Sequence, residues 1–218
     1  MKKVYIIGTG GFAAELTEYI FDNNKYENTD EINIQGYFDL NDENHKRYNF
    51  HAPFLGDEKK YNFPKDAILY LAIGDNSIRR YVIEYFIHKD IIFESFIHHS
   101  CLIASSAKLA QGNILCPHVI IGPNTVLGEY NLLNYKTAIP HDCQIGRQNV
   151  FSPNVNITGY TTIGNNNFFG ISCSALPNIL IGNNNKIQAG VTVDKKIADN
   201  NIVFTMNKIK TMVLYHGK

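Results

Sequence analysis

The sequence lacks net charge and lacks any long apolar run. Its 20 Lys and Arg residues balance 20 Asp and Glu residues. Nucleic-acid-binding proteins usually carry a basic surface, so this neutrality argues against a large nucleic-acid interface. No apolar run approaches the roughly 20 residues that cross a bilayer. The apolar N-terminal stretch is interrupted by GTGG at residues 8–11, so we expect a β-strand there, no signal peptide, and a cytoplasmic protein without membrane insertion.

The sequence also has few cysteines, and no two of them form a CxxC pair. The four lie at positions 101, 116, 143 and 173. This spacing signals neither a zinc site nor a redox motif. Three of the four share one phase of the repeat described next, which favours buried, reduced thiols.

A six-residue apolar period runs through the second half of the chain. Such a period is the signature of a parallel β-helix, in which each hexapeptide gives a short strand and a corner, and three hexapeptides close one coil. We expect the apolar anchor to point inward, a small residue four positions later to fit under the corner, and Gly and Asn to supply positive φ there. The anchors are Ile97, Ile103, Leu109, Leu115, Ile121, Leu127, Leu133, Ile139, Ile145, Phe151, Ile157, Ile163, Phe169, Ala175, Ile181, Ile187 and Val193.

A histidine and an aspartate stand side by side in this repeat, at His141 and Asp142. Coils stack about 4.8 Å apart, so Gly159, at the same phase one coil later, should lie next to His141. A histidine with a carboxylate neighbour can act as a general base, and a glycine N–H can polarise a carbonyl oxygen. Asn134 falls on the neighbouring side of the column.

The other histidines offer no comparable arrangement. A zinc site like that of the β-helical carbonic anhydrases needs three converging histidines, and the repeat proper supplies only His118 and His141. We therefore expect no metal. His98 and His99 lie at the junction of the two halves of the chain, where we expect them to be structural.

Residues 1–94 alternate between strand and helix patterns, which predicts a small, parallel, Rossmann-like α/β domain. We expect a strand, a glycine turn and a helix within 2–21, strands at 32–39 and 67–75, a helix at 77–89, and a strand at 91–97 that leads into the column.

The glycine turn, Gly8-x-Gly10-x-x-Ala13, matches the dinucleotide fingerprint, and Asp39 ends the second predicted strand. Glycines there would let a phosphate approach the helix N-terminus. An NAD-dependent enzyme is one interpretation. However, the domain has half the size of a dinucleotide fold, and the column offers no partner chemistry for a hydride. A nucleotide or a nucleotide-linked substrate therefore fits better.

Three stretches together resemble the bacterial sugar acyltransferases of the PglD/NeuD type: GTGGFAAE at 8–15, LAIGDNSIRR at 71–80, and an asparagine seven residues before HDCxIG at 141–146. The resemblance implies a Rossmann-like nucleotide-sugar-binding domain (1–94), a left-handed β-helix acyltransferase domain (95–204) and a C-terminal tail (205–218). It also implies acetyl-CoA as co-substrate, no metal, and a homotrimer with active sites between subunits.

Roles for single residues follow from the same resemblance. His141 would be the general base, Asp142 its orienting neighbour and Asn134 the upstream site residue, while the Gly159 N–H would stabilise the thioester oxygen. The family's Gly-x-Pro-Ala turn, which holds the CoA adenine, is replaced by residues 205–208, TMNK, and some members have a second histidine where this chain has Val150. The remaining candidates are Lys208 for a CoA phosphate, and Gly8, Gly10, Gly11, Asp39 and Gly74 for the nucleotide sugar.

The expected function is therefore direct acetyl transfer to the amine of a UDP- or dTDP-linked 4-amino-4,6-dideoxy sugar, for lipopolysaccharide or another surface glycan. One alternative is an O-acetyltransferase acting on sialic acid or a polysaccharide. A non-enzymatic alternative is a nucleotide-binding module on a β-helical scaffold. Apolar residues just before the anchors should form outward stripes that a trimer would cover; they are Ile120, Val126, Leu132, Val150, Phe168 and Leu180.

Overall fold

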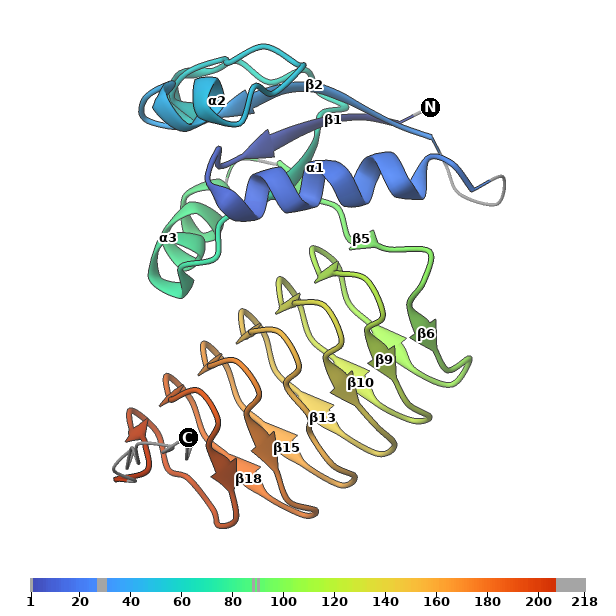
Figure 1. Cartoon of the computed structure of the whole chain (residues 1–218), viewed down its shortest axis with the longest axis vertical. Helices are drawn as coiled ribbons and strands as arrows, with labels where there is room; N and C mark the ends of the chain where they lie inside the picture. Colours follow the sequence, from blue (N-terminus) through green and yellow to red (C-terminus); the bar gives the residue numbers. More distant parts are fainter. Residues whose placement is uncertain (1, 27–30, 88, 90, 207–218) are drawn as a thin grey trace, which may run out of the picture.

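The computed structural model describes residues 2–26, 31–87, 89 and 91–206 of the 218-residue chain. It has two parts, an α/β front domain and a triangular column of stacked coils (Figure 1). This confirms the predicted fold class, a small Rossmann-like domain followed by a left-handed parallel β-helix. None of the helices in the described ranges combines the length and the apolar character that a membrane span requires.

The front domain is built on a four-stranded parallel sheet with the order β2-β1-β3-β4. The expected strand at 91–97 is in fact two strands, because Phe93 ends the front sheet and Phe96 begins the column. The strands are β1 (Lys2–Ile7), β2 (Ile32–Phe38), β3 (Ile68–Leu71) and β4 (Ile92–Phe93), and the helices are α1 (Gly11–Asn23), α2 (Glu43–Arg47), the 3₁₀ helix η1 (Glu58–Lys60) and α3 (Asn76–Phe86).

The column has three faces, each a stack of two-residue parallel strands. The first face comprises β5 (Phe96–Ile97), β8 (Ile114–Leu115), β11 (Leu132–Leu133), β14 (Val150–Phe151), β16 (Phe168–Phe169), β19 (Lys186–Ile187) and β21 (Ile202–Val203). The second face comprises β6 (Leu102–Ile103), β9 (Ile120–Ile121), β12 (Ala138–Ile139), β17 (Ser174–Ala175) and β20 (Thr192–Val193), with Asn156 bridging its two halves. The third face comprises β7 (Lys108–Leu109), β10 (Val126–Leu127), β13 (Gln144–Ile145), β15 (Thr162–Ile163) and β18 (Leu180–Ile181). Each corner is named below by the two faces that it joins.

The predicted anchors form the core of the column. Every anchor from Leu115 to Val193 is buried, and these side chains pack into one continuous cluster. The first three anchors are less buried, and Ile97 is 39% exposed, because they belong to the first coil, which has no coil beyond it. The six-residue period therefore locates the core, and stacking on both sides completes the burial.

The glycines after the anchors are needed for a different reason from the one expected. The third residue after each anchor from Leu115 to Ile181 has a positive φ, between 57° and 61°, as at Asp142 and Asn166. The glycine directly after the anchor lies outside that conformation. A Cβ on Gly128 would instead lie 2.6 Å from the carbonyl oxygen of Gly146 in the next coil. The left-handed position therefore accepts several residue types, with asparagine recurring, whereas the glycine directly after an anchor permits close stacking of the coils.

A ladder of buried asparagines runs along the third–first corner. Each Oδ1 accepts a hydrogen bond from the backbone N–H of the next asparagine, at 2.8–2.9 Å. The ladder satisfies corner amides that no strand can pair. Its last rung, from Asn185 to Asn201, spans 16 residues instead of 18. The rungs are Asn113, Asn131, Asn149, Asn167 and Asn185, each at most 2% exposed.

The front domain packs on the first face of its own column. Leu16 and Ile20 of α1 belong to the same buried cluster as Ile114, Leu132 and Val150 of that face. The expectation that Leu132 and Val150 form an open outward stripe is therefore wrong, because the same chain covers them.

A buried arginine also connects the front domain to the column, at a second place in their contact. Arg79 of α3 is 2% exposed and donates to the carbonyl oxygens of Leu71, Ile73 and Tyr130, at 2.8, 3.1 and 3.4 Å. Burial lowers its pKa to about 10, so the guanidinium stays charged near neutral pH. It links the end of β3 to the third–first corner.

Candidate active site

His141 and Asp142 lie together at the second–third corner, in the third coil. The His141 Nδ1 and the Asp142 Oδ2 are 3.0 Å apart, and about half of the His141 side chain is exposed. We assign the proton to Nδ1, because Oδ2 can only accept, and this leaves Nε2 as the basic nitrogen. Hydrogen bonds from His141 and from Asn124, whose Nδ2 lies 3.1 Å from Oδ1, lower the pKa of Asp142. Asp142 therefore remains a carboxylate that orients the ring.

Gly159, one coil further, lies directly against the imidazole. A Cβ at this position would be 2.5 Å from His141 Cε1, so any larger residue would displace the ring. Tyr160 meets the ring edge-on, with the centroids 5.2 Å apart. Within the described part of the chain, the Gly159 N–H has no hydrogen-bond acceptor. The donor therefore remains available for an oxygen placed beside His141.

Cys143 follows this pair but faces inward. It is fully buried, and its Sγ lies 3.4 Å from the Thr158 carbonyl oxygen and 3.6 Å from that of His141. Burial raises the pKa of its thiol. A buried thiol with a raised pKa is a poor nucleophile.

Asn134 is not brought next to His141 within one chain. It lies at the first–second corner, where its Oδ1 accepts from the Tyr135 N–H at 2.7 Å. Strand β12 of the second face separates the two corners. The predicted CoA contact, Lys208, lies outside the described residues.

The five candidate nucleotide-binding residues line one cavity of the front domain. This cavity, of about 580 Å³, opens at the carboxyl ends of β1, β2 and β3. In parallel α/β sheets, that edge is where ligands bind. Gly8, Gly10, Asp39 and Gly74 come from the three loops that follow these strands, and Gly11 is the first residue of α1.

These residues do different work in the cavity. Gly8 has a φ of +109°, and a Cβ there would lie 2.6 Å from the Ala72 carbonyl oxygen, so it is required by the backbone. Gly10 and Gly74 face open space instead. Gly10 is the N-cap of α1 and offers no capping side chain, which leaves the first N–H groups of the helix free to meet a phosphate.

Asp39 holds the glycine turn in place. Its Oδ2 accepts from the Thr9 N–H at 3.1 Å and from the Thr9 hydroxyl at 2.6 Å, while Oδ1 accepts from the Leu40 N–H at 2.8 Å. A carboxylate has about four lone-pair sites, so it can accept a further donor from a ligand.

The cavity residues that sequence reasoning missed include Glu58, Lys59 and Tyr81. Glu58 is buried, which raises its pKa. The Lys59 Nζ lies 4.3 Å from the centroid of the Tyr81 ring, which is 56% exposed. Glu58 and Lys59 belong to the long loop between β2 and β3, where no motif marked them. In the sequence, Tyr81 was recognisable only as part of the helical pattern that predicted α3.

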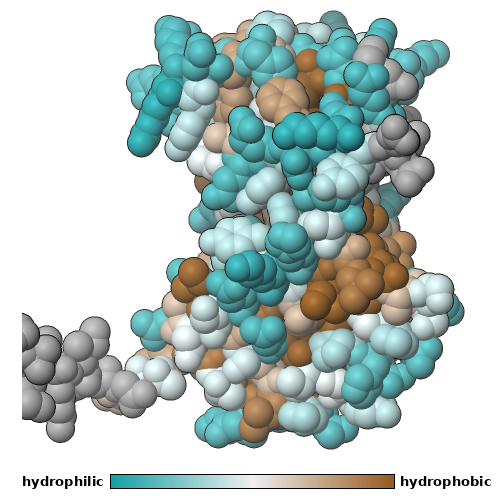
Figure 2. Space-filling model, turned by 45° about the vertical axis from the view of Figure 1, so that its right-hand side comes forward, coloured by the Kyte–Doolittle hydropathy of each residue, from teal (hydrophilic) through white to brown (hydrophobic). Residues whose placement is uncertain are grey.

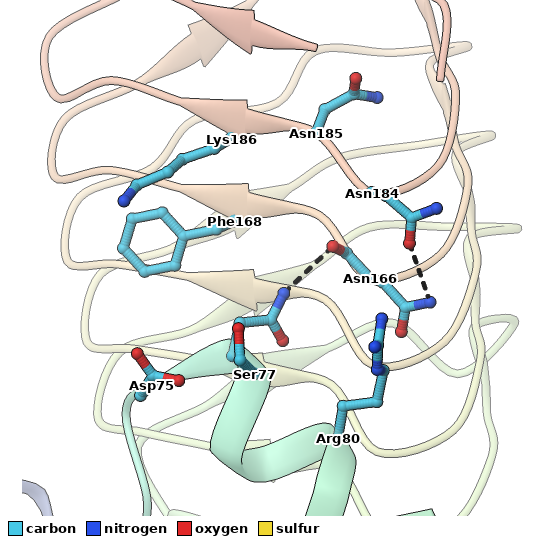
Figure 3. Close-up of a pocket in the computed structure, with 9 residues that line it drawn as sticks. Asp75, Ser77, Arg80, Asn166, Phe168, Asn184, Asn185 and Lys186 are labelled. Carbon is cyan, nitrogen blue, oxygen red and sulfur yellow. Dashed lines mark hydrogen bonds between the residues drawn. The ribbon is translucent and has the colours of Figure 1, made fainter. Parts of the chain in front are cut away.

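A separate polar hollow lies between the start of α3 and the third–first corner (Figure 3). It measures about 320 Å³ and is lined by both Arg80 and Lys186, which lie at opposite sides of it. The side chain of Asn76 donates to the Asn166 carbonyl oxygen at 3.1 Å. The hollow contains none of the predicted site residues and lies at a different corner from His141, so we assign no step of the transfer to it.

Comparison with known protein families agrees with both parts of the fold. Residues 3–86 match the PglD N-terminal domain, and residues 160–195 match the bacterial transferase hexapeptide, six repeats.

Solved structures of similar architecture cover nearly the whole chain. A histidine-to-asparagine mutant of perosamine N-acetyltransferase from Caulobacter crescentus, in complex with CoA and GDP-perosamine, is 21% identical. It has a TM-score of 0.78 over 97% of this chain and 98% of that one. WeeI from Acinetobacter baumannii AYE is 17% identical, with a TM-score of 0.77 over 94% and 97% of the two chains.

The acetyltransferase domain of PglB from Neisseria gonorrhoeae FA1090 shares the fold as well. It is 21% identical, with a TM-score of 0.75 over 90% of this chain and 93% of that one. The two family matches and the shared fold confirm the resemblance of this chain to the PglD-type sugar acyltransferases, with an N-terminal PglD domain followed by a hexapeptide β-helix.

Proposed function

We propose that the protein is an acetyl-CoA-dependent N-acetyltransferase that acts on a nucleotide-linked amino sugar, with His141 as the general base. The observation that carries this proposal is the exposed His141–Asp142 pair with its ring against Gly159. Solved structures of the same fold include a perosamine N-acetyltransferase with CoA and GDP-perosamine, and the PglB acetyltransferase domain with acetyl coenzyme A. We specify the acceptor as a 4-amino-4,6-dideoxy sugar linked to UDP or dTDP, and place the reaction in the cytoplasm on the way to a surface glycan.

The reaction is a direct transfer in this scheme. The sugar amine attacks the thioester carbonyl carbon, and Nε2 of His141 takes the proton that the amine loses. The Gly159 N–H, which has no acceptor among the described residues, stabilises the oxyanion of the tetrahedral intermediate. That intermediate collapses as the C–S bond breaks, and the coenzyme A thiolate leaves with the proton returned by His141. No acyl-enzyme is formed, since Cys143 is buried.

The front cavity holds the nucleotide in this proposal. The free N–H groups at the start of α1 meet the diphosphate, and the exposed ring of Tyr81 offers a surface for the base. Both features lie in the same 580 Å³ cavity, which is of the usual size for a small-molecule site.

The complete site is proposed to form between subunits of a homotrimer. Within one chain, these parts of the site lie at separate places. His141 lies at the second–third corner and Asn134 at the first–second corner. The nucleotide cavity lies beside α3, and α3 contacts the third–first corner through the hydrogen bond from Asn76 to Asn166. A neighbouring column can bring such pieces together. Apolar side chains remain exposed on the two uncovered faces, including Leu102 (67%), Ile120 (42%) and Leu180 (43%). Figure 2 shows apolar side chains gathered on a flank of the column below the front domain.

Mixing two inactive variants tests the shared site. Gly10→Val fills the cavity without a backbone clash, because nothing lies within 4 Å of its Cβ position, and His141→Ala removes the base. Co-expression of the two variants should restore about a quarter of the wild-type activity. In randomly mixed trimers, about one site in four has an intact cavity from one subunit and an intact His141 from its neighbour. Each variant alone should stay inactive. Mixed trimers without activity would show that the cavity and His141 of the same chain act together.

A panel of acceptors tests the chemistry. We expect thiol release from acetyl-CoA with UDP- or dTDP-4-amino-4,6-dideoxy sugars, and none when the 4-amino group is replaced by a hydroxyl. GDP-linked 4-amino sugars and free sialic acid complete the panel. Turnover only with sialic acid would establish an O-acetyltransferase. Nucleotide binding without turnover of any acceptor would indicate a scaffold module.

A further inference from the structure

Two neighbouring histidines meet an aspartate of the front domain at the first–second corner of the first coil. His98 and His99 follow β5, and Asp22 lies in the last turn of α1, whose end is above that corner in Figure 1. One ligand atom from each residue, two Nε2 and one carboxylate oxygen, lies within 4.8 Å of the others. The cluster joins the two parts of the fold far from His141, which lies at the second–third corner.

The distances suit a small tetrahedral cation. The Asp22 Oδ2 is 3.0 Å from His99 Nε2 and 3.3 Å from His98 Nε2. Zinc bonds of about 2.0–2.1 Å to nitrogen and oxygen place neighbouring ligand atoms about 3.3 Å apart in a tetrahedron. Two of the three ligand pairs are therefore already close to that separation, and all three atoms lie within 4.8 Å of one another.

A buried nitrogen without a partner points to such an ion. His98 is 3% exposed, and its Nε2 lies 3.3 Å from the Asp22 Oδ2 but makes no hydrogen bond of good geometry within the described ranges. Unsatisfied buried polar atoms are rare and often mark an ion.

The surroundings already orient the rings. His98 Nδ1 lies 2.8 Å from the Ser100 hydroxyl, which also accepts from the His118 N–H at 3.0 Å. The backbone N–H of His99 donates to Asn23 Oδ1 at 2.6 Å, and the His99 ring stacks on Tyr26. Metal-bound histidines usually have their second nitrogen hydrogen-bonded, as the Nδ1 of His98 is here. When Nε2 of His98 binds zinc, Nδ1 carries the ring proton and donates to the Ser100 hydroxyl. It can then no longer accept from the backbone N–H of Ser100, which lies 3.3 Å away.

We propose that Asp22, His98 and His99 form a zinc site that fixes the front domain to the first coil. Two imidazoles and one carboxylate are ligands that zinc prefers, and the half-exposed Asp22 leaves the fourth position to water. The site is structural, because it ties α1 to the first coil, whereas His141 and Asn134 both lie in the third coil, and it holds whether or not the chain transfers acetyl groups.

Zinc titration of the untagged, full-length protein after chelator treatment and gel filtration tests the site. We expect one zinc per chain by calorimetry, and a melting temperature about 5–10 °C higher at a zinc concentration 100 times the Kd. Cobalt should give the absorption of a tetrahedral site. No binding and no shift in the wild type would overturn the proposal.

Two surface variants and a matched control make the test specific. Asp22→Asn and His99→Gln keep hydrogen-bonding groups at partly exposed positions, so they should fold yet bind zinc at least about 10-fold more weakly. His51→Gln removes an exposed histidine outside the cluster and should bind like the wild type. If zinc still raised the melting temperature of both cluster variants as much as that of the wild type, the ion would bind elsewhere and the proposed site would be refuted.

Discussion

Replacing His141 with alanine is expected to lower the rate of acetyl transfer by about 10²–10⁴-fold, the usual contribution of a general base. The loss should appear in kcat, because the nucleotide cavity of the front domain is unchanged. The measurement is steady-state thiol release from acetyl-CoA with the best acceptor of the panel. The melting temperature should change little, since about half of the His141 side chain is exposed.

Cys143→Ala is the matched control for that substitution. It lies two positions away, but its thiol is buried and donates only to carbonyl oxygens. Activity should therefore stay close to the wild-type level, with at most a small loss of stability. If Cys143→Ala abolished transfer as completely as His141→Ala, direct transfer would have to be abandoned in favour of an acyl-enzyme.

Gly159→Ala tests the same geometry from the opposite side. The added Cβ would lie 2.5 Å from His141 Cε1 and would push the ring away from its place beside the free N–H. We expect a large fall in kcat with little loss of stability, since the histidine can swing into solvent. Wild-type kinetics in this variant would contradict the proposed oxyanion site.

Replacing Asn149 with alanine is expected to reduce the free energy of unfolding by about 2–4 kcal/mol, because buried donors would lose their acceptor. Asn149 Oδ1 accepts from the backbone N–H of Asn167 at 2.8 Å and from its side-chain amide at 3.0 Å. Its own amide donates to Asn131 and to the Gly164 carbonyl oxygen. Chemical denaturation measures the loss.

Asn156→Ala provides the comparison, because Asn156 has the same side chain but is exposed on the second face. Its amide makes one local hydrogen bond to the Asn154 carbonyl oxygen. The expected change is within about 0.5 kcal/mol. Equal effects of the two substitutions would mean that the ladder adds nothing beyond the stacking of the anchors.

The column was predictable from sequence because its core repeats. An anchor at every sixth position can face inward only if the chain turns after each hexapeptide, so burial follows the period from Leu115 to Val193. The same stacking placed His141 beside Gly159, 18 residues apart. The geometry of this pair was therefore accessible from spacing alone.

The joint between the two parts was not predictable, because it depends on contacts without a period. The burial of Leu132 and Val150 requires α1 to lie on the first face. Asp22 meets His99 across 77 residues of sequence. The sequence placed Asp39 at the end of the second strand, but it did not reveal that Asp39 also supports the glycine turn. That second role is seen only in its hydrogen bonds to Thr9. Pairwise contacts of this kind leave no local pattern.

The final rung of the asparagine ladder spans 16 residues, whereas those before it span 18. A shortened turn is harmless there because, up to residue 206 where the described chain ends, β21 is the one strand that continues beyond it. Two residues removed from the middle would misalign every layer beneath the cut. The protein can therefore gain or lose length in whole turns, while smaller insertions and deletions are confined to its far end.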